Sequence, residues 1–207
     1  MAARRSILSA ILIIAAATAL AAPAANAGLI FTAPATYCDK TPVRPFLPWG
    51  DGTFYVLTPG GSFESGTPAW SLAGSARVVS GNEPFHVHSS SDSRSLSLPA
   101  GSSATTPTMC FASGDMQLRL FAVSAGSTSG LKVQIVVRNL LGGLLSVLDG
   151  GTVSPSGSWQ PVKPLGLMFT NLGNLLGTTT AISLRFTPMG SGSWQIDDVY
   201  LDPYKIT

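Results

Sequence analysis

Residues 131–148, "LKVQIVVRNLLGGLLSVL", decide the class of fold. Apolar side chains recur at every second position from Leu131 to Val137, which is the period of a β-strand with one buried face. The two glycines that follow allow a tight reversal into a second apolar run at 144–148. A strand, a glycine turn and a returning strand predict an antiparallel β-hairpin.

Similar short alternating runs recur along the rest of the chain, separated by glycine, proline and serine clusters. They lie at 75–81, 94–101, 115–123, 181–188 and 194–201. No stretch of 11 or more residues has the period of a helix. The pattern predicts an all-β protein, an antiparallel two-sheet β-sandwich with jelly-roll connections. Within it, "DGG" at 149–151 is interpreted as a turn and 169–180 as a long loop.

The first 27 residues have the organisation of a secretory signal peptide. A basic start precedes an apolar run from Ile7 to Leu20, and "AANA" ends at the predicted cleavage site, Ala27. A membrane anchor is the alternative, but this run of 14 residues is shorter than the roughly 20 that a spanning helix needs. We therefore expect a secreted protein with no membrane span after cleavage.

The charge of the mature chain argues against nucleic-acid binding. The full sequence has 12 basic and 10 acidic residues, and cleavage removes Arg4 and Arg5, which leaves equal numbers of each. The remaining basic residues are scattered rather than gathered in a patch. We expect no nucleic-acid partner.

The positions of the prolines and cysteines give two further predictions. Residues 28–52 hold four prolines between 34 and 48, so we interpret them as a Pro-rich arm and residues 53–207 as the sandwich. The two cysteines, Cys38 in the arm and Cys110 in the sandwich, predict one disulfide in an exported protein. It would close a loop of about 72 residues and stabilise the fold by roughly 4 kcal/mol.

Two short motifs resemble a known family. "LTPGGSFESGTPAW" at 57–70 is similar to the "GxFExG…W" opening of carbohydrate-binding modules with the galactose-binding-like jelly roll, and "WQIDDVYL" at 194–201 is similar to their "IDDV" closing strand. The whole mature chain also resembles small secreted bacterial proteins of unassigned function. The resemblance to the modules implies a structural Ca²⁺ where the opening segment meets the closing strand, with Glu64 and Asp197 as its ligands.

The residues themselves leave two roles open for Asp197. If Val199 and Leu201 face the core, alternation places Asp197 on the same inward face and turns Asp198 to solvent or to the opposite side. A buried carboxylate needs a cation or hydrogen-bond donors, and Ca²⁺ prefers carboxylate and carbonyl oxygens. The alternative is that Asp197 accepts backbone N–H bonds or pairs with an arginine.

Aromatic residues are the candidate ligand-binding groups, because exposed rings can stack on sugar faces. Trp49 in the arm and Tyr55 are the rings we expect to be exposed, and Tyr200 is a third candidate. The repeated "SGSWQ" at 156–160 and 191–195 favours two equivalent packing positions for its tryptophans over a ligand platform.

A pair of histidines is the remaining candidate for a metal site. His86 and His88 flank Val87, so on a strand they would share a face. Glu83 or Asp92 could complete such a site; otherwise the two histidines are surface residues.

Three classes of function remain. No "GxSxG" elbow is present, and a glycosidase needs two placed carboxylates, for which Glu83 with Asp198 is a pair that nothing singles out. We predict no catalytic residues. The three candidate functions are a non-catalytic carbohydrate-binding module, a structural or protein-interaction domain at the cell surface, and a glycan-active enzyme. The corresponding partners are an extracellular polysaccharide or a cell-surface protein.

Overall fold

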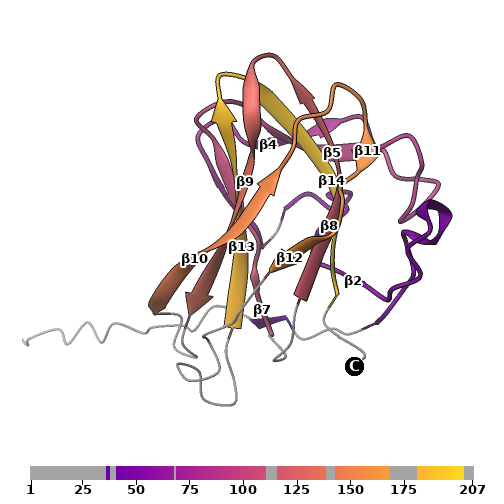
Figure 1. Ribbon diagram of the computed structural model, residues 1–207, viewed down its shortest axis with the longest axis horizontal. Helices are drawn as coiled ribbons and strands as arrows, with labels where there is room; N and C mark the ends of the chain where they lie inside the picture. Colours follow the sequence, from indigo (N-terminus) through magenta and orange to yellow (C-terminus); the bar gives the residue numbers. More distant parts are fainter. Residues whose placement is uncertain are drawn as a thin grey trace, which may run out of the picture. The chain divides into compact units, whose positions relative to one another are not determined.

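The computed structural model describes residues 36–37, 41–67, 69–110, 116–138, 143–167 and 181–202. They form two seven-stranded sheets (Figure 1). The first sheet contains β1 (Thr36–Tyr37), β3 (Ser71–Ala73), β6 (Ser103–Thr105), β7 (Thr108–Cys110), β9 (Thr128–Arg138), β10 (Leu144–Val153) and β13 (Ala181–Gly190). The second contains β2 (Val56–Leu57), β4 (Arg77–Ser80), β5 (Arg94–Leu98), β8 (Met116–Ala125), β11 (Gln160–Pro161), β12 (Leu165–Leu167) and β14 (Ser193–Asp202).

The chain crosses repeatedly between the two sheets. From β5 it passes to β6 and β7, returns to β8, crosses to β9 and β10, and ends with β13 in one sheet and β14 in the other. Among the described strands, the pair β1–β7 is the only parallel one, and its register sets Tyr37 opposite Met109. The predicted antiparallel two-sheet β-sandwich with jelly-roll connections is confirmed.

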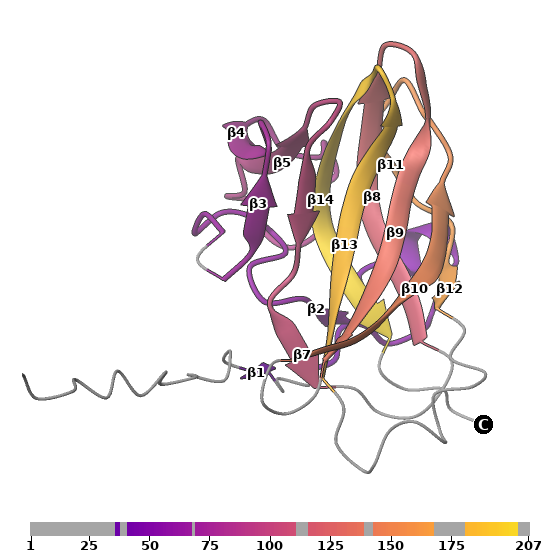
Figure 2. The same ribbon diagram turned by 90° about the vertical axis from the view of Figure 1, so that its left-hand side faces the viewer.

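The hairpin that the sequence predicts is formed by β9 and β10, which pair antiparallel. Figure 2 shows β13 on the other side of β9, so that β10 lies at the edge of the sheet. The prediction of a turn at 149–151 is wrong, because these residues lie inside β10. The register shifts between Asp149 and Gly151, and Gly151 has a φ of +98°. The glycines therefore accommodate a β-bulge rather than a reversal.

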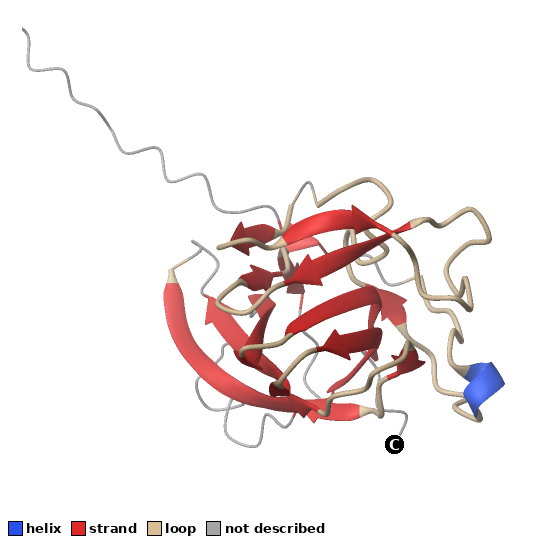
Figure 3. Cartoon of the chain, turned by 90° about the horizontal axis from the view of Figure 1, so that it is seen from above, coloured by secondary structure: helices blue, strands red, loops and turns tan. Residues whose placement is uncertain are grey.

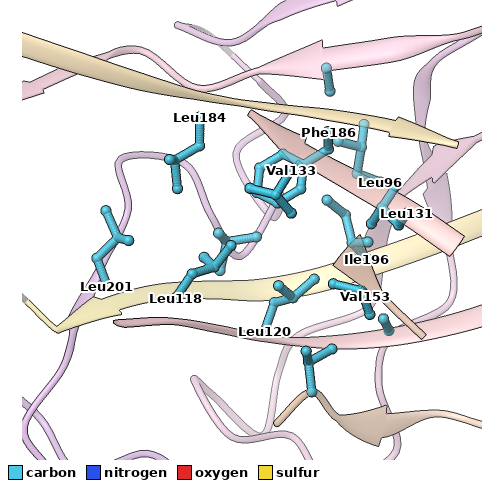
Figure 4. Close-up of a cluster of buried hydrophobic side chains, with 14 of the residues drawn as sticks. Leu96, Leu118, Leu120, Leu131, Val133, Val153, Leu184, Phe186, Ile196 and Leu201 are labelled. Atoms are coloured by element: carbon cyan, nitrogen blue, oxygen red, sulfur yellow. The ribbon is translucent and has the colours of Figure 1, made fainter. Parts of the chain in front are cut away.

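The main core lies between the sheets. Alternate residues of β9 and β13 in one sheet meet alternate residues of β8 and β14 in the other (Figure 4). The fully buried members labelled there include Leu118, Leu120, Leu131, Val133, Leu184, Phe186 and Ile196. The period-two pattern read from the sequence thus corresponds to the face of each strand that meets the opposite sheet.

A second, smaller core covers the opposite face of the second sheet. It consists of Phe46, Tyr55, Phe121 and Tyr200. Phe46 comes from the arm and is fully buried, whereas the short 3-10 helix η1 (Leu47–Trp49) that follows lies outside the two layers of strands (Figure 3). The described part of the arm, 41–52, therefore packs onto the sandwich.

An ion pair closes this second core. Arg119 donates to Oδ2 of Asp51 at 2.6 Å, and the Tyr55 hydroxyl donates to the same oxygen at 2.8 Å. Burial raises the pKa of Asp51, but hydrogen bonds from Thr53, Tyr55 and Arg119 outweigh it and lower the pKa to about 2. The ionised pair thus fastens the arm to β8.

Three sequence predictions fall wholly or partly outside the described residues. They are the signal peptide at 1–27, the disulfide partner Cys38, and the loop at 169–180. In the described part of the chain, no helix is long and apolar enough to cross a bilayer.

Candidate functional site

The opening motif and the closing strand meet in space. The backbone N–H of Val199 donates to the carbonyl of Gly61 at 3.1 Å, and Thr58 N donates to the carbonyl of Val199 at 2.8 Å. A Cβ on Gly61 would lie 2.4 Å from Thr58 Oγ1 and 2.9 Å from Val199 O. Glycine is therefore required where the segment preceding Phe63 crosses β14.

A β-bulge in β14 leaves both aspartates buried outside the main core, with Asp197 opposite Phe121 of the second core. The register with β8 shifts between Asp197 and Tyr200, and Asp198 has a φ of +47°, in the left-handed region. The exposed fractions of Asp197 and Asp198 are 0% and 1%. The expectation that Asp197 shares the inward face of Val199 and Leu201 is wrong, because the bulge breaks the period of two and only Val199 and Leu201 lie in the main core. Asp198 is not turned to solvent either, since the loop described next contacts it.

The loop between β4 and β5 covers these two carboxylates. Asp197 accepts hydrogen bonds from Glu83 N at 3.3 Å and from Asp198 N at 2.9 Å. Oδ2 of Asp198 accepts a hydrogen bond from His88 N at 3.0 Å. Backbone amides of the loop thus tie it to the closing strand.

Glu83 shapes the loop from within. Its side chain is fully buried, and its carboxylate accepts hydrogen bonds from the backbone N–H groups of Phe85 and Val87, the latter at 2.6 Å. His86, between them, has a φ of +51°. One buried carboxylate therefore fixes a tight turn whose other residues are mostly exposed.

His88 and Asp92 complete the cluster. Their Nδ1 and Oδ2 atoms are 2.7 Å apart, the Asp92 side chain is 5% exposed and the His88 side chain 39% exposed. One ligand atom from each of His88, Asp92 and Asp198 lies within 4.8 Å of the others. Oδ1 of Asp198 is buried and has no hydrogen-bond partner. Glu83, His88, Asp92, Asp197 and Asp198 are called the acidic cluster below.

The charges of the acidic cluster do not balance. Four buried carboxylates face one imidazole, and the contact of His88 with Asp92 is the only ion pair that any of them makes within the described chain. Burial, and then the charge of Asp198, raises the pKa of Asp197; burial also raises the pKa of Asp198. Near neutral pH the cluster therefore needs a proton or a cation.

Glu64 lies at a different place from the one the resemblance implies. Its carboxylate accepts hydrogen bonds from Ser93 N at 2.8 Å and Arg94 N at 2.7 Å, at the start of β5. Asp197 bonds to other amides, and no contact joins the two carboxylates within the described chain. Calcium held by Glu64 and Asp197 stays a prediction.

The candidate ligand-binding aromatics are mostly buried. Tyr55 and Tyr200 are 0% and 2% exposed, so the expectation that Tyr55 is an exposed ring is wrong. The arm covers both rings, a long-range packing that a local pattern does not reveal. Trp49 is half-buried against Phe85. The two tryptophans of the repeated "SGSWQ" both pack against a core, but their positions are not equivalent: Trp194 is buried in the main core, whereas Trp159 is half-buried against the second core.

A polar groove of about 380 Å³ lies on the outer face of the first sheet. Its side chains include Ser71, Ser103, Thr105, Gln134, Arg185 and Thr187. Strand register sets Thr105 opposite Ser71 on one side and opposite Arg185 on the other, and Arg185 opposite Gln134. These residues occupy the polar positions between the core residues of each strand, which is the sequence signal that could have revealed the groove.

Comparisons with known proteins assign no family or activity to the chain. No protein-family model matches the sequence, and no curated protein matches it. A xylan-binding domain of Paenibacillus barcinonensis is 12% identical, with a TM-score of 0.43, over 71% of this chain and 94% of that one. A family 11 carbohydrate-binding module of Clostridium thermocellum, in complex with a mixed-linked tetrasaccharide, is 16% identical, with a TM-score of 0.41, over 73% and 96%. The enzymatically active domain of tailspike protein 4 from bacteriophage CBA120 is 12% identical, with a TM-score of 0.47, over 71% of this chain but only 21% of its own. Several of the structures found are thus carbohydrate-binding modules, the class that the sequence motifs resemble.

Proposed function

We propose that this protein is a secreted, non-catalytic module that binds an extracellular polysaccharide in the groove on the outer face of the first sheet. The observation that supports this is the row of hydrogen-bonding side chains across β3, β6, β13 and β9. Paired strands hold these groups at fixed spacing, so the groove is preorganised for a polar, extended ligand.

The chemistry of the groove suits sugar hydroxyls. Serine and threonine hydroxyls both donate and accept hydrogen bonds, as does the Gln134 amide, whereas the Arg185 guanidinium supplies donors in a rigid plane. The Arg185 guanidinium makes no hydrogen bond or ion pair with any described residue. Its donors are therefore available to a ligand.

Two features support a non-catalytic role. Among the described residues, no carboxylate lines the groove, although glycoside hydrolysis ordinarily uses two. Glu83 and Asp198, the pair left open by the sequence, do lie in one cluster, but they are 0% and 1% exposed. A polysaccharide cannot reach either carboxylate in this conformation.

The test is retention on insoluble polysaccharides together with a glycan array. We expect Arg185→Ala to weaken binding at least tenfold, because it removes the guanidinium from the groove. Arg77→Ala is the matched control, since Arg77 is an exposed arginine in the second sheet, and it should bind like the wild type. Failure of the wild type to bind any glycan, or equal binding by Arg185→Ala, would refute the proposal.

A protein-interaction role is the second candidate, favoured by one surface feature. The edge strand β10 exposes Leu144, Leu145 and Val147 by 60%, 46% and 39%. An exposed apolar edge strand is a natural place for another chain to dock. A double Leu144→Ser, Leu145→Ser variant should then lose attachment to a cell-surface protein while keeping its glycan binding; unchanged attachment would exclude this edge.

A further inference from the structure

We propose that His88, Asp92 and Asp198 bind a divalent transition-metal cation, with Zn²⁺ as the best match to their donor atoms. The site is independent of the polar groove, which lies on the other sheet. The site lies where the loop between β4 and β5 contacts the bulge of β14. His88 and Asp198, which are hydrogen-bonded there, are 110 residues apart in the sequence.

The geometry of the three donors supports this assignment. One atom from each side chain lies within 4.8 Å of the others, which is close enough for a shared cation after small side-chain rotations. The His88 and Asp92 side chains already touch at 2.7 Å. A cation would replace the hydrogen that these two groups share.

Asp198 supplies the observation that points to a missing ligand. Its Oδ2 accepts a backbone hydrogen bond from His88, but its Oδ1 is buried without any partner. A buried carboxylate oxygen with no donor or cation is costly. The oxygen belongs to the same residue whose ligand atom joins the three-residue group.

The negative charge around the three donors also favours a cation as their missing partner. Glu83 and Asp197 are buried beside the three donors, and neither has a lysine or arginine partner in the described chain. Backbone amides satisfy their oxygens but leave the negative charge uncompensated. A divalent ion would offset the repulsion among four carboxylates.

The donor types select the class of metal. One imidazole nitrogen with two carboxylate oxygens suits Zn²⁺, whereas Ca²⁺ and Mg²⁺ prefer sites made of oxygen alone. Three protein ligands leave a fourth position of a tetrahedral ion for water.

The site has a rigid frame and an access route. Asp198 is fixed by the amide of His88 itself, so the two donors are positioned together. His88 also lines an open pocket of about 380 Å³ with Val87, Tyr200 and arm residues such as Arg44. An ion can therefore approach from the exposed side of the imidazole.

The experiment uses the untagged full chain, stripped with a chelator and titrated with Zn²⁺ by calorimetry, with metal content measured after gel filtration. We expect one Zn²⁺ per chain, a higher melting temperature with the ion, and binding that Ca²⁺ does not block. His88→Gln and Asp198→Asn should each weaken Zn²⁺ binding at least tenfold. His86→Gln is the matched control, because His86 lies in the same loop but outside the three-residue group, and its affinity should be unchanged.

Several results would overturn the assignment. These are a wild type that retains no Zn²⁺, a His88→Gln variant with wild-type affinity, and a His86→Gln variant that loses as much affinity as His88→Gln. Because the His88 side chain is 39% exposed, its substitution should leave the fold intact, which circular dichroism in chelator will verify. If Asp198→Asn does not fold, the X-ray absorption spectrum of the wild-type Zn²⁺ complex decides: a first shell of one imidazole nitrogen and oxygens supports the site, and a shell without nitrogen refutes it.

Discussion

Replacing Phe46 by alanine should remove much of the stability of the fold. The Phe46 ring is fully buried, and its centroid lies 5.2 Å from that of Tyr55, 5.5 Å from that of Phe121 and 5.7 Å from that of Tyr200. The Arg119 guanidinium stacks 4.0 Å above the ring centroid. Deleting a buried phenylalanine side chain costs about 3–5 kcal/mol, and the ring contacts add to the transfer term. We expect a loss of about 4 kcal/mol, against a total of roughly 5–15 kcal/mol for a domain.

Urea unfolding, followed by tryptophan fluorescence and circular dichroism, measures this loss. Trp49 packs against the same cluster and should report its disruption. Leu47→Ala is the control, because the neighbouring Leu47 is 57% exposed, and it should change the free energy of unfolding by less than about 0.5 kcal/mol. A loss below about 1 kcal/mol in Phe46→Ala, far under the value for a core phenylalanine, would refute the reasoning, because the arm would then not be part of the cooperative fold.

Three further predictions concern acid stability, the cysteines and calcium. The pKa of Asp51, held at about 2, lies below the roughly 3.9 of an unfolded aspartate, so its stabilisation is fully present above that value and is lost as pH falls toward 2. Asp51→Asn should remove about 2 kcal/mol of that pH dependence, which urea midpoints between about pH 2 and pH 6 will show; curves parallel to the wild type would contradict it. Mass spectrometry without reduction should find Cys38 bonded to Cys110, and two free thiols in exported protein would exclude the disulfide. If Glu64 and Asp197 hold Ca²⁺, melting temperatures should rise with the ion, by a stabilisation of roughly 2.7 kcal/mol at a hundredfold excess over its dissociation constant, and Glu64→Gln should abolish the effect.

The sheets could be predicted from the sequence because the long strands turn alternate apolar residues toward the core between the sheets. The alternation from Leu131 to Val137 identifies β9, and the same period identifies β13. The pattern fails where a bulge adds a residue, as between Asp149 and Gly151, because a bulge depends on how two strands pair rather than on either strand alone. It also fails for Tyr55, whose burial depends on the distant Phe46.

Single residues of the acidic cluster could be predicted from the sequence, but their assembly into one site could not. The sequence indicates that Asp197 is buried, although on the wrong face of β14, and it leaves open that Asp92 completes a metal site with a histidine. Their meeting depends on the left-handed backbone of Asp198 and on hydrogen bonds across 110 residues, neither of which has a local signature.

The hydrogen bonds of this cluster support the proposal that it does more than tie the loop to β14. Backbone amides of the loop and of β14 satisfy both oxygens of Asp197 and both oxygens of Glu83. If the acids served only to fasten the loop, Asp198 would be satisfied in the same way, since an unpaired buried oxygen costs about 1–3 kcal/mol. Instead, its second oxygen has no donor, and one oxygen of the same carboxylate lies within 4.8 Å of ligand atoms of His88 and Asp92. The fold thus fixes this carboxylate through one oxygen and leaves the other available to a ligand.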